Sequence, residues 1–164
     1  MVMELLTRSP PETAVNVPGL DAFMTAYIKS ACMAECRGLG IPCPDEYTHE
    51  EATSVLERGR VGTVVVKPDL DAGAATGVRF LHDGESLRGA LRECSRAYGH
   101  TLIQEYIPGD VDAMRTVVLL FSRASVLRAA FTTSKIRQWP MAGGQTAVSC
   151  STDDCHLVDQ VLPF

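Results

Sequence analysis

The segment that decides the fold reads Val61-Gly62-Thr63-Val64-Val65-Val66-Lys67-Pro68-Asp69-Leu70-Asp71-Ala72-Gly73-Ala74-Ala75-Thr76-Gly77-Val78. Its first part is rich in β-branched residues and apolar at successive positions, which is typical of a strand buried on both faces. Pro68 ends this strand, because proline has no backbone N–H to give to a sheet. The strand therefore delivers Lys67 to the start of a loop.

That loop has the composition of a phosphate-binding segment. Residues 71–77 are almost all Gly, Ala or Thr, so their backbone N–H groups can approach a polyphosphate closely, while Lys67 supplies a point charge. The spacing does not match the Walker sequence G-x-x-x-x-G-K-[ST]. On spacing alone, a plain turn next to an exposed lysine is the simpler interpretation.

The flanking segments predict an α+β protein. Upstream, apolar residues at helical spacing predict a helix over residues 21–38, two prolines make residues 40–44 extended, and Thr48 with Glu51 forms a capping box for a second helix. The elements expected downstream are a strand at 78–81, a helix at 83–98 closed by Gly99, a strand at 101–107, an antiparallel pair at 114–121 and 125–133, a strand near 146–150, and a last short helix capped by Asp153.

The net charge and the hydropathy of the chain indicate which kinds of partner it binds and where in the cell it is found. The formal net charge is -5 and the pI is about 5.3, so the chain has no overall attraction for nucleic acid or an anionic membrane. No apolar run approaches the roughly 18 residues of a membrane span, and the N-terminus lacks the pattern of a signal peptide. A cytoplasmic protein is expected.

The cysteines do not predict a metal site. They show neither a CxxC pair nor zinc-ribbon spacing, and reduced, mostly buried thiols are expected. Cys155 and His156 are adjacent without a surrounding motif, and neighbouring side chains usually diverge, so a nucleophile–base pair is not expected there.

The motifs, taken in order, resemble the ATP-grasp superfamily, in particular its carbamoyl-phosphate-synthase-like branch. They are Asp21…Lys29, Gly40-Ile41-Pro42-Cys43-Pro44, Val64-Val65-Val66-Lys67-Pro68, Gly77-Val78, Ile103-Gln104-Glu105-Tyr106-Ile107-Pro108-Gly109, and Lys135-Ile136-Arg137-Gln138-Trp139-Pro140 with Gly143-Gly144. The resemblance covers about residues 21–150. It implies an N-terminal extension (1–20), an ATP-grasp small lobe (21–103), and the beginning of a large lobe with an antiparallel sheet (104–164).

The resemblance also implies roles for the phosphate-binding residues. ATP would lie between the lobes, with Lys29 reaching phosphate and Lys67 contacting both phosphate and the adenine edge. The loop residues that would close over the triphosphate are Ala72, Gly73, Ala74, Ala75, Thr76 and Gly77.

The segment Gln104, Glu105, Tyr106, Ile107 would be the hinge between the lobes. Backbone groups of Glu105 and Ile107 would pair with the donor and acceptor of the adenine edge, and Tyr106 would support the base.

The expected ribose-binding acid is Asp110 or Asp112, with a slight preference for Asp112. Lys135 and Arg137 match basic positions near the γ-phosphate or an acyl phosphate, where the planar guanidinium suits phosphate oxygens. The simpler alternative for this pair is a solvated strand end.

The implied function is the ATP-binding portion of an ATP-dependent carboxylate–amine or carboxylate–thiol ligase that acts through an acyl phosphate. Its partners would be ATP and a small carboxylate, and family members use Mg²⁺. The alternatives are a non-catalytic α+β interaction or structural module that has lost nucleotide binding, and a kinase-like transferase, for which Asp112 is the best available base.

Three departures from the family pattern limit this expectation. No Glu-x-Asn-Pro-Arg-like stretch occurs, so the magnesium ligands would lie beyond Phe164; no Rossmann-like series precedes the motifs; and the loop is poor in glycine, with Ile28 where an aspartate often precedes the first lysine. The acids Asp153, Asp154 and Asp159 are interpreted as cap and surface residues. The expectation is a truncated portion without full activity, which a homodimer or a second chain could complete.

Overall fold

The computed structural model describes residues 18–58, 62–70, 73, 75–141 and 144–164. Most of the expected N-terminal extension, as well as Ala72, Ala74 and Gly143, lies outside the described residues. The elements are α2 (Leu20–Tyr27), α3 (Lys29–Gly38), α4 (His49–Glu57), β1 (Val64–Pro68), β2 (Arg79–Leu81), α5 (Gly84–Tyr98), β3 (Thr101–Glu105), the 3-10 helix η1 (Val111–Ala113), β4 (Arg115–Phe121), β5 (Leu127–Trp139), β6 (Gln145–Thr152) and α6 (Cys155–Val161). The α+β class is confirmed.

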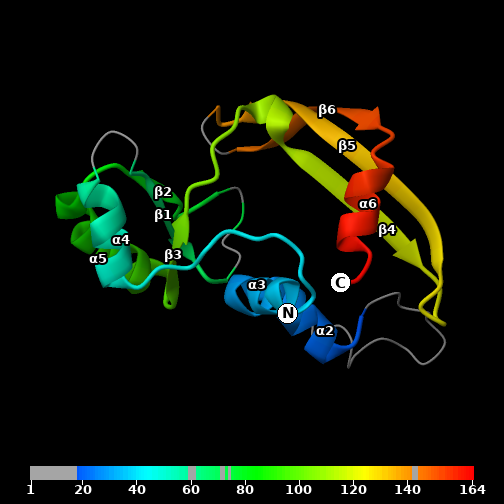
Figure 1. The fold of residues 1–164 in the computed structure, drawn as a ribbon, viewed down its shortest axis with the longest axis horizontal. Helices are drawn as coiled ribbons and strands as arrows, with labels where there is room; N and C mark the ends of the chain where they lie inside the picture. Colours follow the sequence, from blue (N-terminus) through cyan, green and yellow to red (C-terminus); the bar gives the residue numbers. More distant parts are fainter. Residues whose placement is uncertain (1–17, 59–61, 71–72, 74, 142–143) are drawn as a thin grey trace.

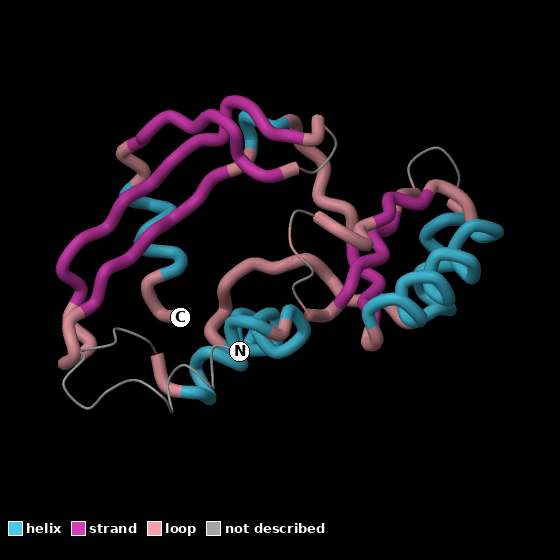
Figure 2. The backbone as a smooth tube through the Cα atoms, turned by 180° about the vertical axis from the view of Figure 1, so that it is seen from behind, coloured by secondary structure: helices cyan, strands magenta, loops and turns pink. Residues whose placement is uncertain are grey.

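The described strands form two antiparallel three-stranded sheets, ordered β2-β1-β3 and β4-β5-β6. Figure 1 shows α4 and α5 against the first sheet, α6 against the second, and the segment after β3 crossing from one sheet to the other. The view from behind in Figure 2 shows the second sheet curving toward α2 and α3. No helix in the described part of the chain has both the length and the apolar character to cross a membrane.

The hydrophobic core lies between β1 and the helices α4 and α5. Val64 and Val66 are fully buried on this side of β1, and Leu87 of α5 and Leu56 of α4 pack in the same cluster. Successive strand residues point to opposite faces, so the intervening residues Val65 and Lys67 lie on the other face of the sheet, where they are only half-buried.

The predicted capping box of α4 and the predicted end of α5 at Gly99 are confirmed. Thr48 and Glu51 form the expected reciprocal capping box of α4. Asp83 accepts a hydrogen bond from the Ser86 N–H at the start of α5, and Gly99 ends that helix with a φ of 82°. Such short-range hydrogen bonds depend only on neighbouring residues, which is why the sequence predicts them.

Three expectations about the elements were wrong. The single helix over residues 21–38 is two helices, broken at Ile28, which adopts an extended conformation and pairs with Leu70 as an isolated bridge. The second strand of the second sheet, β5, runs through Trp139 rather than stopping at Thr133. Asp154, not Asp153, caps the last helix, through the N–H of Leu157.

The second sheet has a largely uncovered face. Val118 of β4 pairs with Phe131 of β5, and their side chains share a face on which both are about half exposed. On the other face, Thr132 is buried and its hydroxyl donates to the Thr152 carbonyl oxygen of β6. This sheet is therefore held mainly by strand pairing rather than by a core of its own.

The capping box gives a first prediction. Thr48→Ala should lower the free energy of unfolding by about 1 kcal/mol, because the Glu51 N–H loses its acceptor at the helix start. Urea titration followed by circular dichroism measures the loss. Ser54→Ala, on the same helix, is the matched control, because the Ser54 hydroxyl only bonds back to the Glu50 carbonyl. Equal effects of the two substitutions would contradict the capping role.

Candidate nucleotide-binding site

Strand β1 carries the site on the face turned away from the helical core. Thr63 and Val65 line a cavity on this face, and Lys67 follows on the same face about 7 Å further along the strand. Burial lowers the pKa of Lys67, and the nearby positive charge of Lys29 lowers it further, whereas Glu46 and Asp69 act in the opposite direction. The two lysines predicted to bind phosphate are thus brought together by the fold.

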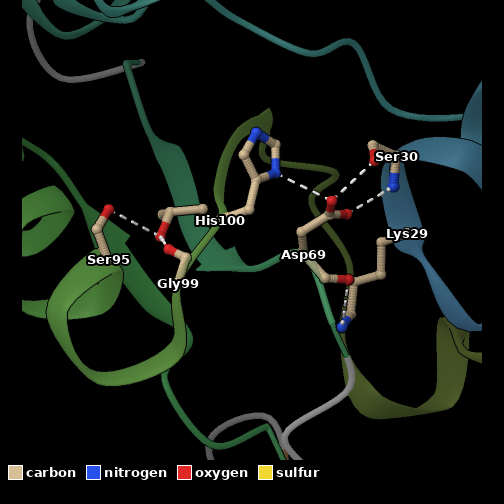
Figure 3. Close-up of polar contacts among 7 residues, drawn as sticks. Lys29, Ser30, Asp69, Ser95, Gly99 and His100 are labelled. Atoms are coloured by element: carbon tan, nitrogen blue, oxygen red, sulfur yellow. Dashed lines mark hydrogen bonds and ion pairs between the residues drawn. The ribbon is translucent and has the colours of Figure 1, made fainter.

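Asp69 joins the strand that carries Lys67 to the helix that carries Lys29 (Figure 3). Its carboxylate accepts hydrogen bonds from the Ser30 N–H at 2.8 Å and from the Ser30 hydroxyl at 2.9 Å, and it contacts His100 Nδ1 at 3.0 Å. Its carbonyl oxygen accepts from the Lys29 N–H at 3.1 Å and from Lys29 Nζ at 3.3 Å. A carboxylate is favourable at this position because helix α3 begins there.

The pKa of Asp69 is lowered although the residue is only 6% exposed. Burial by itself raises the pKa, but the hydrogen bonds from Ser30 and the contact with His100 favour the charged form and outweigh it. Asp69 is therefore an ionised carboxylate with its oxygens satisfied.

The small-residue loop turns sharply where it is described. The Thr76 N–H donates to the Gly73 carbonyl, Ala75 has a φ of 59°, and Gly77 has a φ of 80°. A Cβ at Gly77 would lie 2.7 Å from the ring of Tyr98 and 2.8 Å from Pro68. The glycine thus allows the loop to return against the end of β1 and into β2.

A cavity of about 990 Å³ lies between the two sheets. Its lining residues come from β1 and β2, from the connection after β3, and from the ends of β5 and β6: Thr63, Val65, Phe80, His82, Tyr106, Ile107, Gly109, Asp110, Val111, Met114, Ile136, Arg137, Gln138, Trp139, Met141 and Ala147. The lining is largely apolar with a few polar groups, as in sites for small organic ligands.

The predicted hinge contributes two of its four residues to this cavity. Tyr106 and Ile107 line it, and the ring of Tyr106 meets that of Phe80 edge-on at 5.8 Å. Gln104 is buried instead, with its amide directed at the sulfur of Met33. The Glu105 N–H donates to the Asp45 carbonyl at 2.9 Å, so this donor is already engaged within the protein.

The structure separates the two candidate ribose acids. Asp110 lines the cavity, whereas Asp112 does not, and the Asp112 carbonyl oxygen accepts a hydrogen bond from the Arg115 guanidinium. Both acids were candidates because the offset from the hinge is uncertain by a residue or two, and Asp112 was slightly preferred. In the structure, Asp110 precedes the 3-10 helix η1 and Asp112 lies within it.

The two predicted catalytic cations have different surroundings. Arg137 lines the cavity. Lys135 does not; its Nζ donates to the Gln138 side-chain oxygen and to the Gly144 carbonyl, each at 3.2 Å. Lys135 therefore holds together the turn between β5 and β6.

Sequence analysis missed several cavity residues. Trp139 is three-quarters exposed at the end of β5, and Phe80 and His82 lie on β2 and just beyond it. His82 Nδ1 is 3.0 Å from the Thr63 hydroxyl. The alternation of side chains along β1 and β2 could have placed these residues on one face of the sheet. No local sequence pattern indicates that the second sheet lies opposite that face.

The cysteine chemistry is only partly as expected. All six thiols are free, but only Cys94 is buried, and Cys150 and Cys155 are exposed, so the expectation of mostly buried cysteines was wrong. Asp153 raises the pKa of Cys155, which is the opposite of activation, and the ring of the adjacent His156 contacts Gln160 rather than the thiol. Among the described residues, no three His, Cys, Asp or Glu side chains form a group that could hold a metal ion.

Comparison with solved structures identifies the fold as that of part of a D-alanine–D-alanine ligase. D-Ala-D-Ala ligase from Helicobacter pylori matches with a TM-score of 0.55 and 19% identity, over 87% of this chain and 43% of that one. D-alanyl-alanine synthetase A from Vibrio cholerae matches with a TM-score of 0.63 and 13% identity, over 88% and 47%. The chain thus spans less than half the length of these structures.

At these identities the similarity shows a shared fold with part of these ligases. No protein-family model matches the sequence, and no curated protein sequence does either.

The loop glycines give a second prediction. Gly73→Ala should lower the free energy of unfolding by about 1 kcal/mol, because an L-residue at this position is forced to a positive φ. Its Cβ would meet open space, so no steric clash adds to this loss. Gly77→Ala should cost about 1 kcal/mol more, because its Cβ also collides with Tyr98 and Pro68. Thermal unfolding of both variants tests this. Equal losses would show that packing of Gly77 against the end of β1 does not matter.

The lowered pKa of Asp69 gives a third prediction. The unfolded carboxyl has a pKa of about 3.9, and a lowered folded pKa contributes stability that is complete above that value and is lost as the pH falls through the folded pKa. The difference in unfolding free energy between wild type and Asp69→Asn should therefore be constant above about pH 5 and shrink below about pH 4. Urea titrations from pH 3 to pH 7 measure it; a difference independent of pH would contradict the ionised state.

Proposed function

We propose that this chain binds ATP in the cavity between its two sheets and forms the nucleotide-binding portion of an ATP-dependent carboxylate ligase. The observation that carries the proposal is the arrangement along β1. Val65 faces an apolar cavity, and Lys67, with Lys29 beside it, follows on the same face about 7 Å further on. A nucleotide needs the same order: an apolar slot for the base and positive charge at the distance of its phosphates.

The base would lie between Val65 of the first sheet and the apolar residues of the second. Ile136 and Met141 offer that second surface, and Tyr106 closes the slot at the hinge. The Glu105 N–H is engaged with Asp45. We therefore expect the adenine edge to pair with the backbone of Tyr106 or Ile107 rather than with the Glu105 N–H.

Asp110 is the better candidate for the ribose hydroxyls, because it lines the cavity and carries acceptor oxygens. The phosphates would extend toward Lys67 and Lys29, with Gly73 and residues 75–77 of the small-residue loop over them. The lowered pKa of Lys67 reflects a charge that is buried without a full counter-charge, and a phosphate would supply that counter-charge.

Arg137 would face the transferred phosphoryl group from the second sheet. In the proposed reaction a carboxylate oxygen of the substrate attacks the γ-phosphorus, ADP leaves, and an amine or thiol then displaces phosphate from the acyl phosphate. This chain would contribute positioning and positive charge, which are the main sources of catalysis in such transfers. Lys135 would act indirectly, by holding the turn that follows Arg137 and Trp139.

Magnesium does not fit the residues described. The described part of the chain offers no group of three potential ligands, and the carboxylate of Asp154 caps α6. The carbamoyl-phosphate-synthase-like branch and a homodimer or second chain that completes the site remain predictions of the sequence.

The fourth prediction tests nucleotide binding. ATP at about 100 times its dissociation constant should raise the free energy of unfolding by about 2.7 kcal/mol, and Lys67→Ala should abolish most of this gain. Thermal unfolding with and without ATP, each with and without Mg²⁺, measures it. Arg123→Ala, which removes an exposed charge far from the cavity at the turn between β4 and β5, is the control. An equal ATP response in wild type and Lys67→Ala would overturn the assignment of Lys67.

A further inference from the structure

One residue, through its carboxylate and its carbonyl oxygen, connects the elements that carry the two lysines of the proposed phosphate site. Lys29 and Lys67 stand on different elements, far apart in the sequence, and the isolated bridge between Ile28 and Leu70 brings the start of α3 beside the end of β1. The link is Asp69, two residues beyond Lys67 and in contact with both residues at the start of α3, Lys29 and Ser30.

The contacts of Asp69 define one position of α3. Its carboxylate receives the N–H and the hydroxyl of Ser30, and its carbonyl oxygen receives the N–H and the Nζ of Lys29. On the other side, the Asp69 N–H donates to the His100 carbonyl at 2.9 Å, and the His100 ring contacts the carboxylate (Figure 3). Asp69 thus connects α3 to the end of β1 and to the residue that precedes β3.

The carboxylate adds a side-chain contact to the Ile28–Leu70 bridge at the start of this helix. Ile28, immediately before α3, makes no side-chain cap, and the first turn of the helix carries no acidic residue of its own. Helix N-termini leave unpaired N–H groups, and a carboxylate satisfies them and the helix dipole. Here that carboxylate comes from the strand that carries the other lysine.

We infer that Asp69 is a positioning residue for the phosphate site: it holds Lys29 at the distance from Lys67 at which both can face one phosphate chain. The inference rests on the proposed nucleotide site for its functional consequence, but the positioning itself does not. It assigns no contact between Asp69 and the nucleotide.

The sign of the effect separates positioning from simple electrostatics. Asp69 is a negative charge near two lysines, so as a charge alone it opposes phosphate binding, and its removal would strengthen the affinity for ATP. If Asp69 acts by positioning, its removal weakens the affinity for ATP, on the order of 10-fold, and leaves the affinity for adenosine unchanged, because adenosine has no phosphate for the lysines to bind.

The test compares Asp69→Ala and Asp69→Asn with Asp83→Ala. Asp83 is a matched control: its carboxylate accepts from the N–H and the hydroxyl of Ser86 at the start of α5, as that of Asp69 does with Ser30, but among the described residues it contacts no lysine. Calorimetry gives the affinities for ATP and for adenosine. We expect Asp69→Ala to lose ATP affinity selectively, Asp69→Asn to retain most of it, since its amide oxygen can still accept from the Ser30 N–H, and Asp83→Ala to match wild type.

A second measurement is independent of nucleotide binding. The lysines of the chain are Lys29, Lys67 and Lys135, so a short amine-reactive cross-linker followed by peptide mass mapping reports the Lys29–Lys67 pair directly. We expect a strong cross-link in wild type and Asp83→Ala, and a several-fold lower yield in Asp69→Ala. Ser30→Ala, which removes one hydroxyl donor and no charge, should give an intermediate yield.

The outcomes are distinguishable. If wild type binds neither ATP nor adenosine but the cross-link falls only in Asp69→Ala, the positioning stands and the proposed function fails. If Asp69→Ala keeps the wild-type cross-link, or binds ATP as tightly as wild type or more tightly, the positioning role is overturned. Equal losses of ATP and adenosine affinity in Asp69→Ala, with an unchanged cross-link, would also overturn it and indicate a purely structural role.

Discussion

The alternation of side chains along β1 is the constraint on which the rest of the structure depends. As the middle strand of its sheet, β1 gives Val64 and Val66 to the core beneath α4 and α5. It turns Val65 to the cavity and places Lys67 further along the same face. A shift of one residue in register would exchange these sets, burying the lysine in the core and exposing valines. The buried valines therefore fix the position of Lys67 as firmly as they fix the core.

The positive charges of Lys67 and Lys29 at the end of β1 are unfavourable in the free protein, and an anionic ligand would relieve this. Lys67 is partly desolvated and lies near Lys29, and both effects lower its pKa. Asp69 and Glu46 only partly compensate. Sites that bind anions tightly often keep such uncompensated positive charge, because the ligand then gains more from pairing than water would provide.

The two halves of the molecule are stabilised differently. The first sheet has a core closed by two helices, whereas the second depends on strand pairing and leaves Val118, Leu120 and Phe131 exposed on one face. The chain matches less than half the length of the ligases that share its fold. The cavity uses both sheets, so its shape depends on the less well packed half as well as on the core.

The sequence by itself determined the local elements and the order of motifs: the capping box of α4, the ends of α5, the buried strand before Lys67, and the resemblance of the series to ATP-grasp proteins. These depend on residues close in the chain. Only the tertiary structure decided that Ile28 breaks the first helix to pair with Leu70, that Asp110 rather than Asp112 faces the cavity, and that Asp69 joins the helix of Lys29 to the strand of Lys67. These features arise from contacts between residues far apart in the sequence, whose geometry no local pattern encodes.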